Sequence, residues 1–135
     1  MDDISNQPNA LNYALRSFTD NTCQTVFLTE FPVFKITHGV RYAAEMYAMQ
    51  WFIIVIFSSQ ELPCLKEAAL QIWDMYRLNN NVVEIEAKNE LGEIVFSTLF
   101  DDTIFLYDYF QLFWIDGLLL LPTETIAKPN KYFNF

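Results

Sequence analysis

Glycine, histidine, cysteine and positive charge are scarce in this sequence. Its 135 residues include 3 glycines, 1 histidine, 2 cysteines and 8 Lys or Arg residues. Three glycines leave little room for phosphate-binding loops, and the sequence has no P-loop, GxGxxG, GxSxG, HExxH or EF-hand pattern. The cysteines, Cys23 and Cys64, are far apart, so they do not supply the closely spaced ligands of a zinc site. We therefore expect no cofactor.

Negative charge dominates the few ionisable residues. Asp and Glu number 17, which gives a net charge of −9 and a pI near 4.3. Binding to nucleic acid or to an anionic membrane needs a basic patch, and no Lys/Arg cluster is present. The acidic balance suits solubility, a basic protein partner, a cationic ligand or a divalent metal.

Targeting and membrane-spanning signals are also missing. The N-terminal MDDISNQPN is acidic and polar, unlike a signal peptide. The longest stretch without charge, Met46–Gln60, has 15 residues, whereas a spanning helix needs about 20 apolar ones. Two free thiols suit a reducing compartment. We expect a cytoplasmic protein that does not contact membranes or bind nucleic acid directly.

Apolar and aromatic residues are abundant. Hydrophobic residues make up 53 % of the chain and aromatic residues 17 %. This composition excludes a disordered or collagen-like chain and predicts one folded domain over residues 1–135. We expect the polar lead, 1–9, and the tail, 127–135, to be loosely ordered.

Hydrophobic spacing predicts a short helix over Ala10–Phe18 and a long one over residues 38–57, with Thr37 as its N-cap. The long segment is apolar on all sides from Trp51 onward, so we expect it to be buried. Its β-branched run, Ile53–Ile56, would also fit a strand; we prefer a helix.

The remaining periodic segments favour strands. The segments 24–28 and 33–36 are β-like, and 70–78 fits either a helix or a strand. Two hairpins are predicted, one from 82–88 to 93–100 with Gly92 in its turn, the other from 110–115 to 118–121 around Asp116-Gly117. Together these segments predict an α+β fold in which a long buried helix packs on an antiparallel meander sheet of about four to five strands.

Three stretches carry a resemblance to a known family. They are THGVRYAAEMYAMQWFI (37–53), LQIWDMYRLNNNVVEIEAKNELGEIVFSTLFDD (70–102) and GLLLLPTE (117–124). In order and spacing they resemble a domain-of-unknown-function family of small bacterial, plasmid- and phage-borne proteins with a TDGVKY…FxVW…LLLPSE pattern. The resemblance covers roughly residues 11–124 and implies a strand at 70–78 and a helix at 38–57.

This chain differs from the family pattern at two points. His38 stands where the family tends to have Asp, and Asp101-Asp102-Thr103-Ile104 replaces a TDFP step. The resemblance implies no activity, substrate or cofactor, and it points to mobile genetic elements.

Candidate chemical groups are few. Asp101 and Asp102, with Asp108 or Glu124, would supply oxygen ligands for a divalent cation; the alternative is a helix cap. His38 would sit in a first helical turn, where the dipole favours a neutral hydrogen-bonding imidazole. Cys64 follows Pro63 and would start a helix, but its pairing with His38 has no sequence motif behind it. Structural roles are the favoured interpretation of all these groups.

Aromatic residues are the strongest candidates for a binding role. We expect that one small domain cannot bury the whole run from Phe105 to Trp114, and exposed aromatic patches usually mark interfaces. An internal core is an equal alternative for this run, and for Trp51 and Trp73 core packing is favoured over a ligand pocket. The predicted interface or ligand-pocket residues are Trp51, Trp73, Tyr107, Tyr109, Phe113 and Trp114.

These observations predict a small acidic, non-catalytic protein that acts through protein–protein contact, as a homodimer or with a protein partner, and that modulates a process of a mobile element or phage. One alternative is a small-molecule binder with an apolar pocket at Trp51 and Trp73, where Arg41 or Arg77 would hold a negative group. The other is a metal-dependent hydrolase built on the Asp cluster.

Overall fold

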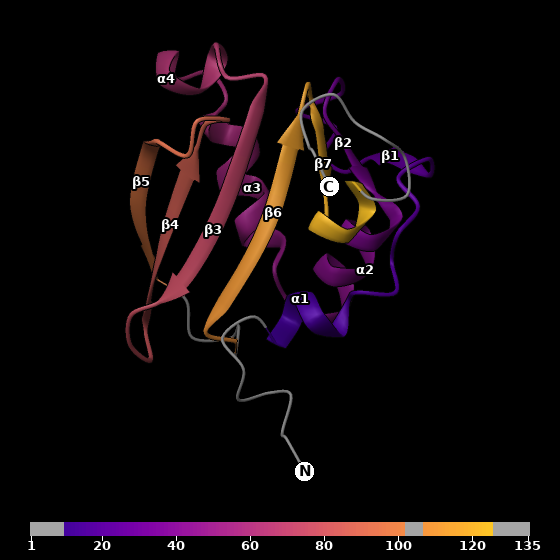
Figure 1. Ribbon diagram of the computed structural model, residues 1–135, viewed down its shortest axis with the longest axis horizontal. Coiled ribbons are helices and arrows are strands. Elements are labelled where there is room, and N and C mark those ends of the chain that lie inside the picture. The colour runs from indigo at the N-terminus through magenta and orange to yellow at the C-terminus, as the bar shows by residue number, and fades with distance from the viewer. Residues whose placement is uncertain (1–9, 102–106, 126–135) are drawn as a thin grey trace.

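The computed structural model describes residues 10–101 and 107–125 of the chain (Figure 1). The predicted loose segments, 1–9 and 127–135, lie outside the described residues. The strands are β1 (Gln24–Val26), β2 (Lys35–Thr37), β3 (Leu70–Arg77), β4 (Val82–Lys88), β5 (Ile94–Asp101), β6 (Tyr109–Ile115) and β7 (Leu118–Leu120). The helices are α1 (Ala10–Ala14), α2 (His38–Met46), α3 (Gln50–Ser59), α4 (Pro63–Lys66) and the 3-10 turn η2 (Pro122–Thr125).

The described strands form one mixed sheet in the order β1-β2-β7-β6-β3-β4-β5. All neighbours are antiparallel except β2 and β7, which run parallel. The α+β class is confirmed, whereas the expected antiparallel meander of four to five strands is wrong. Strands β1 and β2 have three residues each, and such short segments join a sheet only where tertiary contacts hold them.

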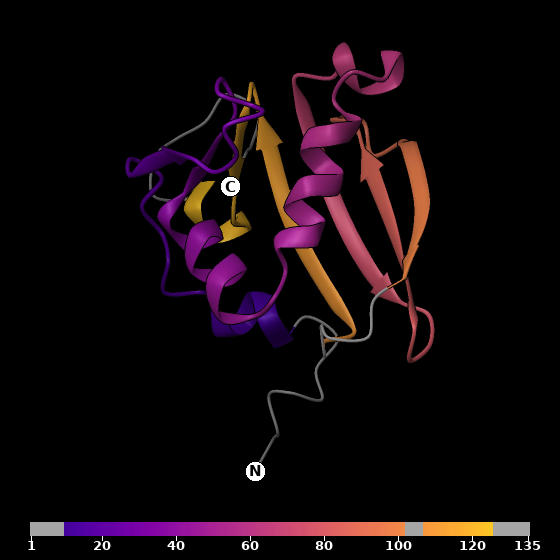
Figure 2. The same cartoon turned by 180° about the vertical axis from the view of Figure 1, so that it is seen from behind.

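The predicted long helix, 38–57, is wrong because the chain turns between α2 and α3. Thr37 is the N-cap of α2, as predicted, and its hydroxyl accepts a hydrogen bond from the Val40 amide. Ala48 then takes a left-handed conformation with φ 55°, which a continuing helix does not allow. Figure 2 shows α2 and α3 crossing the same face of the sheet in different directions.

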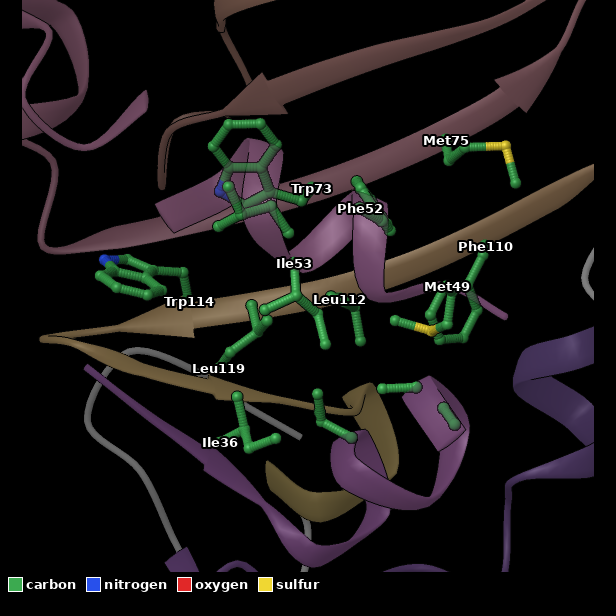
Figure 3. Packing of buried hydrophobic residues seen from close by; sticks show 14 of the residues in the cluster. Ile36, Met49, Phe52, Ile53, Trp73, Met75, Phe110, Leu112, Trp114 and Leu119 are labelled. Carbon is green, nitrogen blue, oxygen red and sulfur yellow. The ribbon is translucent and has the colours of Figure 1, made fainter. Parts of the chain in front are cut away.

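The core fills the space between that face and α3. Phe52 of α3 meets Phe110 of β6, with ring centroids 6.2 Å apart, and Phe57 meets Trp114 at 5.7 Å. Trp73, Ile53 and Leu112 lie between the same layers (Figure 3). Burial of each such side chain contributes about 1.5–3 kcal/mol, so the α3 contact is a main source of stability. No helix of the described residues is long and apolar enough to cross a membrane.

Both predicted hairpins are confirmed, and the ambiguous segment 70–78 is resolved as β3. Gly92 has φ 81°, and Asn89 Oδ1 accepts hydrogen bonds from two amides of the same turn. Asp116 and Gly117, with φ 47° and 87°, form the turn between β6 and β7. Positive φ at both central residues gives the local twist that a two-residue hairpin needs.

Helix α1, predicted over Ala10–Phe18, ends at Ala14 and meets β6 beyond the end of β7. Asn12 Nδ2 donates to the Gln111 carbonyl at 2.9 Å, and the Gln111 amide donates to Asn12 Oδ1 at 2.8 Å. The Asn12 side chain therefore pairs with β6 in the way a neighbouring strand would. This contact satisfies backbone groups of β6 where the short β7 no longer reaches.

Candidate functional site

The predicted aromatic residues divide between the core and its margins. Trp73, Phe113 and Trp114 are buried, and so is Phe110, which belongs to the same aromatic run as Phe113 and Trp114. The remaining predicted residues, Trp51, Tyr107 and Tyr109, are partly buried. Alternation along β6 sends Phe110 and Trp114 toward the helices, which sequence alone did not establish.

Trp51 and Trp73 already have protein neighbours where a ligand would have to sit. The Trp51 ring stacks on Phe100 at 5.0 Å, and the Trp73 ring lies 5.6 Å from Phe96. The Trp73 indole N–H donates to Gln71 Oε1 at 2.8 Å. The side chains that would have held an anion lie elsewhere. Arg41 donates to Thr25 and the Val26 carbonyl, and Arg77 donates to the Asn79 carbonyl.

Glu124 is buried at the start of α2 and is not near a cation site. Its Oε1 accepts from the Thr37 hydroxyl at 2.5 Å and from the Leu121 amide at 2.7 Å, and its Oε2 accepts from the Gly39 amide at 3.3 Å. Burial raises the pKa of Glu124 above its ordinary value, while these hydrogen bonds oppose the shift. The carboxyl group therefore fastens η2 to the N-terminus of α2.

The predicted Asp cluster is not assembled by the part of the chain that the structure describes. Asp101 is exposed at the end of β5, Asp108 is exposed beside β6, and Asp102 lies outside the described residues. Among residues 10–101 and 107–125, no group of three His, Cys, Asp or Glu side chains is placed to hold a metal ion.

A second buried carboxylate, Asp74, lies on the sheet face opposite the helices. It accepts hydrogen bonds from the Tyr109 hydroxyl and from Gln111 Nε2, and its Oδ2 lies 3.5 Å from Lys88 Nζ. Burial and the hydrogen bond to Asp74 raise the pKa of Tyr109. Burial and the nearby carboxylates likewise raise the pKa of Tyr76 to about 12. Both phenols stay protonated near neutral pH, and the Tyr109 hydroxyl is the donor in its hydrogen bond with Asp74.

Exposed apolar side chains gather beside the edge strand β5. Leu99 is 62 % exposed, and Ile54 of α3 and Leu62 are 44 % and 40 % exposed. A groove of about 340 Å³ runs between α3 and β5. We call this region the β5 surface. It consists of the outer edge of β5 and the side chains of Ile54, Leu62, Phe96, Leu99 and Phe100.

The structure separates His38 from Cys64 and brings it to Cys23 instead. Cys64 lies in a depression beside the β4–β5 hairpin. Cys23 precedes β1, and its carbonyl accepts from the His38 amide at 3.0 Å. Both cysteines are free and exposed. The Cys23–His38 neighbourhood was missed because its only sequence signal is the pairing of two three-residue strands.

The comparisons with known proteins identify a family. Residues 9–125 match a family of unknown function, DUF6876, so the chain belongs to that family. No curated protein and no solved structure matches the chain. Membership confirms the family resemblance seen in the sequence, while a bacterial or phage origin stays a prediction.

Proposed function

We propose that this member of a family of unknown function acts through protein–protein contact and assembles as a homodimer through the β5 surface. The observation that carries the proposal is the edge strand β5. It is eight residues long, borders the sheet, and has one charged residue, Asp101, at its end. A long, apolar and uncharged edge is a template for pairing with another strand.

The hydrogen-bond alternation of the sheet indicates which groups of β5 are available. The Val82 carbonyl accepts from the Leu78 amide, so Val82 directs its backbone toward β3. The next residue, Val83, therefore faces β5, where it is opposite Phe100. By the same alternation, the backbone groups of Ser97 and Leu99 point away from β4. The Leu99 carbonyl accepts from the Thr98 hydroxyl at 3.4 Å, and its second lone pair remains available to a new strand, as do the other outward groups.

A second copy fits this edge in an antiparallel register centred on Thr98. Ser97 then pairs with the partner's Leu99, which joins backbone groups that both point outward. Phe96 lies opposite the partner's Phe100, and such cross-strand aromatic pairs contribute about 0.2–1 kcal/mol each. The bulge near Ala87 and Lys88 stays at the end of the paired region.

Charge favours a second copy at this edge over most of the remaining surface. The chain carries a net charge of −9, so contacts between two acidic faces would repel. In the register centred on Thr98, Asp101 lies opposite the partner's Val95, and no like charges face each other across the strands. The other sheet edge, β1, has only three residues, which gives a much shorter pairing surface.

The experiment is static light scattering over a wide range of protein concentration. We expect a dimer, and we expect Leu99→Lys and Ser97→Pro to give monomers with unchanged circular dichroism. Lysine at Leu99 places charge in the apolar interface, and proline at Ser97 removes an outward amide without removing one directed to β4. Val33→Lys is the matched control, because Val33 is 77 % exposed and precedes β2 at the opposite end of the sheet. A monomeric wild-type protein at every concentration would rule out the dimer.

Each copy in the dimer carries a net charge of −9, which would attract a further protein of basic character. A role as a modulator in a mobile element or phage is the proposal that the family resemblance supports. The experiment for this wider role is affinity purification from the native host's lysate with wild-type protein and Val33→Lys in parallel. A stoichiometric protein partner recovered with both supports the role, and recovery of the chain alone contradicts it.

A further inference from the structure

Cys23 and His38 line one cleft at the end of the sheet opposite β5. The cleft has a volume of about 330 Å³, and Ser17, Phe18, Thr19 and Asp20 complete its lining. Its place beside β1 leaves it open when β5 is covered by a second copy. Any chemistry at this cleft is therefore independent of the proposed dimer.

The pairing of β1 with β2 brings the backbones of Cys23 and His38 together. In the β1–β2 pair, Gln24 lies opposite Thr37, and one further step places Cys23 opposite His38. The 3.0 Å hydrogen bond from the His38 amide to the Cys23 carbonyl continues the ladder to that step. The two backbones are therefore adjacent, and both side chains line the same cleft.

Acyl transfer does not suit this pair, because the nearby backbone amides are already occupied. The His38 amide donates to Cys23, the Gly39 amide to Glu124, and the Val40 amide to the Thr37 hydroxyl. A tetrahedral intermediate would need free donors at this point to stabilise its oxyanion. Addition to a conjugated C=C bond depends less on such donors, because the charge of its enolate is shared between the carbonyl oxygen and the α-carbon, whereas the charge of a tetrahedral intermediate stays on oxygen.

We propose that Cys23 is a nucleophilic site for small, uncharged electrophiles of the α,β-unsaturated carbonyl class, with His38 as its proton acceptor. The thiol sulfur forms a bond to the β-carbon, the C=C π pair becomes a double bond between the α-carbon and the carbonyl carbon, and the C=O π pair moves to oxygen to give an enolate. The thiol proton passes to the imidazole and then to the α-carbon. The product is the thioether adduct, and the addition consumes no oxidant or reductant.

The cleft lining supports that class of ligand. Phe18 forms an aromatic wall; its ring lies 5.6 Å from the His38 ring and 5.1 Å from the Tyr42 ring. Asp20 holds Thr22 through two hydrogen bonds and brings negative charge to the rim. This carboxylate and the net charge of −9 disfavour anionic electrophiles.

The test is timed alkylation of the full chain with N-ethylmaleimide, followed by peptide mass spectrometry that quantifies both cysteines. Cys64 is the control within the same molecule, because it is also free and exposed but has no imidazole in its depression. We expect Cys23 to react at least about tenfold faster than Cys64, a modest effect for general-base assistance. The same measurement in denaturant should bring the two rates together.

The variant His38→Asn distinguishes two causes of a fast Cys23 reaction, assistance by the imidazole and accessibility of the thiol. We expect this variant to reduce the Cys23 rate to that of Cys64 and to leave the Cys64 rate unchanged. Equal rates in the wild-type protein would overturn the proposal. A fast Cys23 that stays fast in His38→Asn would also overturn it, because accessibility alone would then explain the rate.

Discussion

The Thr37 hydroxyl donates a hydrogen bond of 2.5 Å to Glu124 Oε1, across 87 positions of sequence. Thr37 lies in THGVRY and Glu124 in GLLLLPTE, two of the stretches that carry the family resemblance. Thr37 Oγ1 also accepts from the Val40 amide. One side chain therefore caps α2 and binds the Glu124 carboxylate of η2. The two stretches therefore build one structural junction.

Removal of the Glu124 carboxylate should destabilise this junction. Glu124→Ala leaves the Thr37 hydroxyl and the amides of Gly39 and Leu121 without their acceptor. We expect the free energy of unfolding in urea to fall by at least about 2 kcal/mol, because unpaired buried polar groups are costly. Glu90→Ala is the control, since Glu90 is exposed in the β4–β5 turn, and it should change stability little. Equal losses in the two variants would contradict the role of the junction.

The pH dependence of stability should also report Glu124. Burial raises its pKa in the folded chain above the ordinary 4.5, so the folded state keeps a proton that the unfolded state has released. This contribution is fully present below the unfolded value and is lost as the pH rises through the folded value. We expect the stability of the wild-type chain relative to Glu124→Gln to fall as pH rises from 4.5. Urea unfolding at a series of pH values measures it, and a constant difference would argue against the shift.

Gly39→Ala should destabilise the folded chain, although the same substitution in most helices stabilises it. Alanine in place of glycine in a helix usually stabilises by up to about 1 kcal/mol. Here a Cβ would meet Leu121 Cδ1 at 2.6 Å, Glu124 Oε2 at 2.8 Å and Phe18 Cβ at 2.9 Å. We expect a loss of about 1–3 kcal/mol from this overpacking, measured by thermal or urea unfolding. A stabilised variant would show that the junction is looser than the structure indicates.

Ala48→Gly should stabilise the chain. Ala48 has φ 55° between α2 and α3, a conformation that costs an L-residue roughly 1–2 kcal/mol and glycine little. Part of this gain is offset by the larger backbone entropy of unfolded glycine, so we expect about 0.5–1 kcal/mol. Ala14→Gly, at an exposed position in α1, is the control and should destabilise. If both variants lose stability equally, residue 48 is helical in solution.

Gln60 and Gln71 should behave as a coupled pair. Their side-chain amides exchange two hydrogen bonds of 2.8 and 2.9 Å. Gln71 Oε1 also accepts a hydrogen bond from the Trp73 indole N–H. Gln71→Leu should cost about 1–3 kcal/mol, because it removes the partner of Gln60, of the Trp73 indole and of the Leu65 and Ala68 carbonyls. Adding Gln60→Leu should cost less than it does alone, since its partner is already gone. A double-mutant cycle in urea measures the coupling, and additive losses would show that the two amides act independently.

Local patterns were sufficient for much of the fold. Asp116-Gly117 and Gly92 marked both hairpins, Thr37 marked the start of α2, and alternation in 82–88 matched β4. These features depend on residues close in sequence. The break at Ala48 was missed, because the surrounding apolar residues satisfy a helical pattern and only packing against the sheet decides where the chain must turn.

The candidate sites were less predictable. Trp114 was a candidate interface residue and lies in the core, because burial depends on which sheet face a residue occupies. Trp73, for which core packing was favoured over a ligand pocket, lies there as well. The approach of Cys23 to His38 likewise depends on the pairing of β1 with β2.

The sequence by itself determined the α+β class, the acidic charge, the two hairpins and the helix cap, because composition and turn chemistry act over a few residues. Only the tertiary structure decided the mixed sheet, the divided helix and the partners of Glu124, Asp74 and Cys23. Those contacts join residues tens of positions apart, and the burial of a shared core selects among the many pairings that local preferences allow.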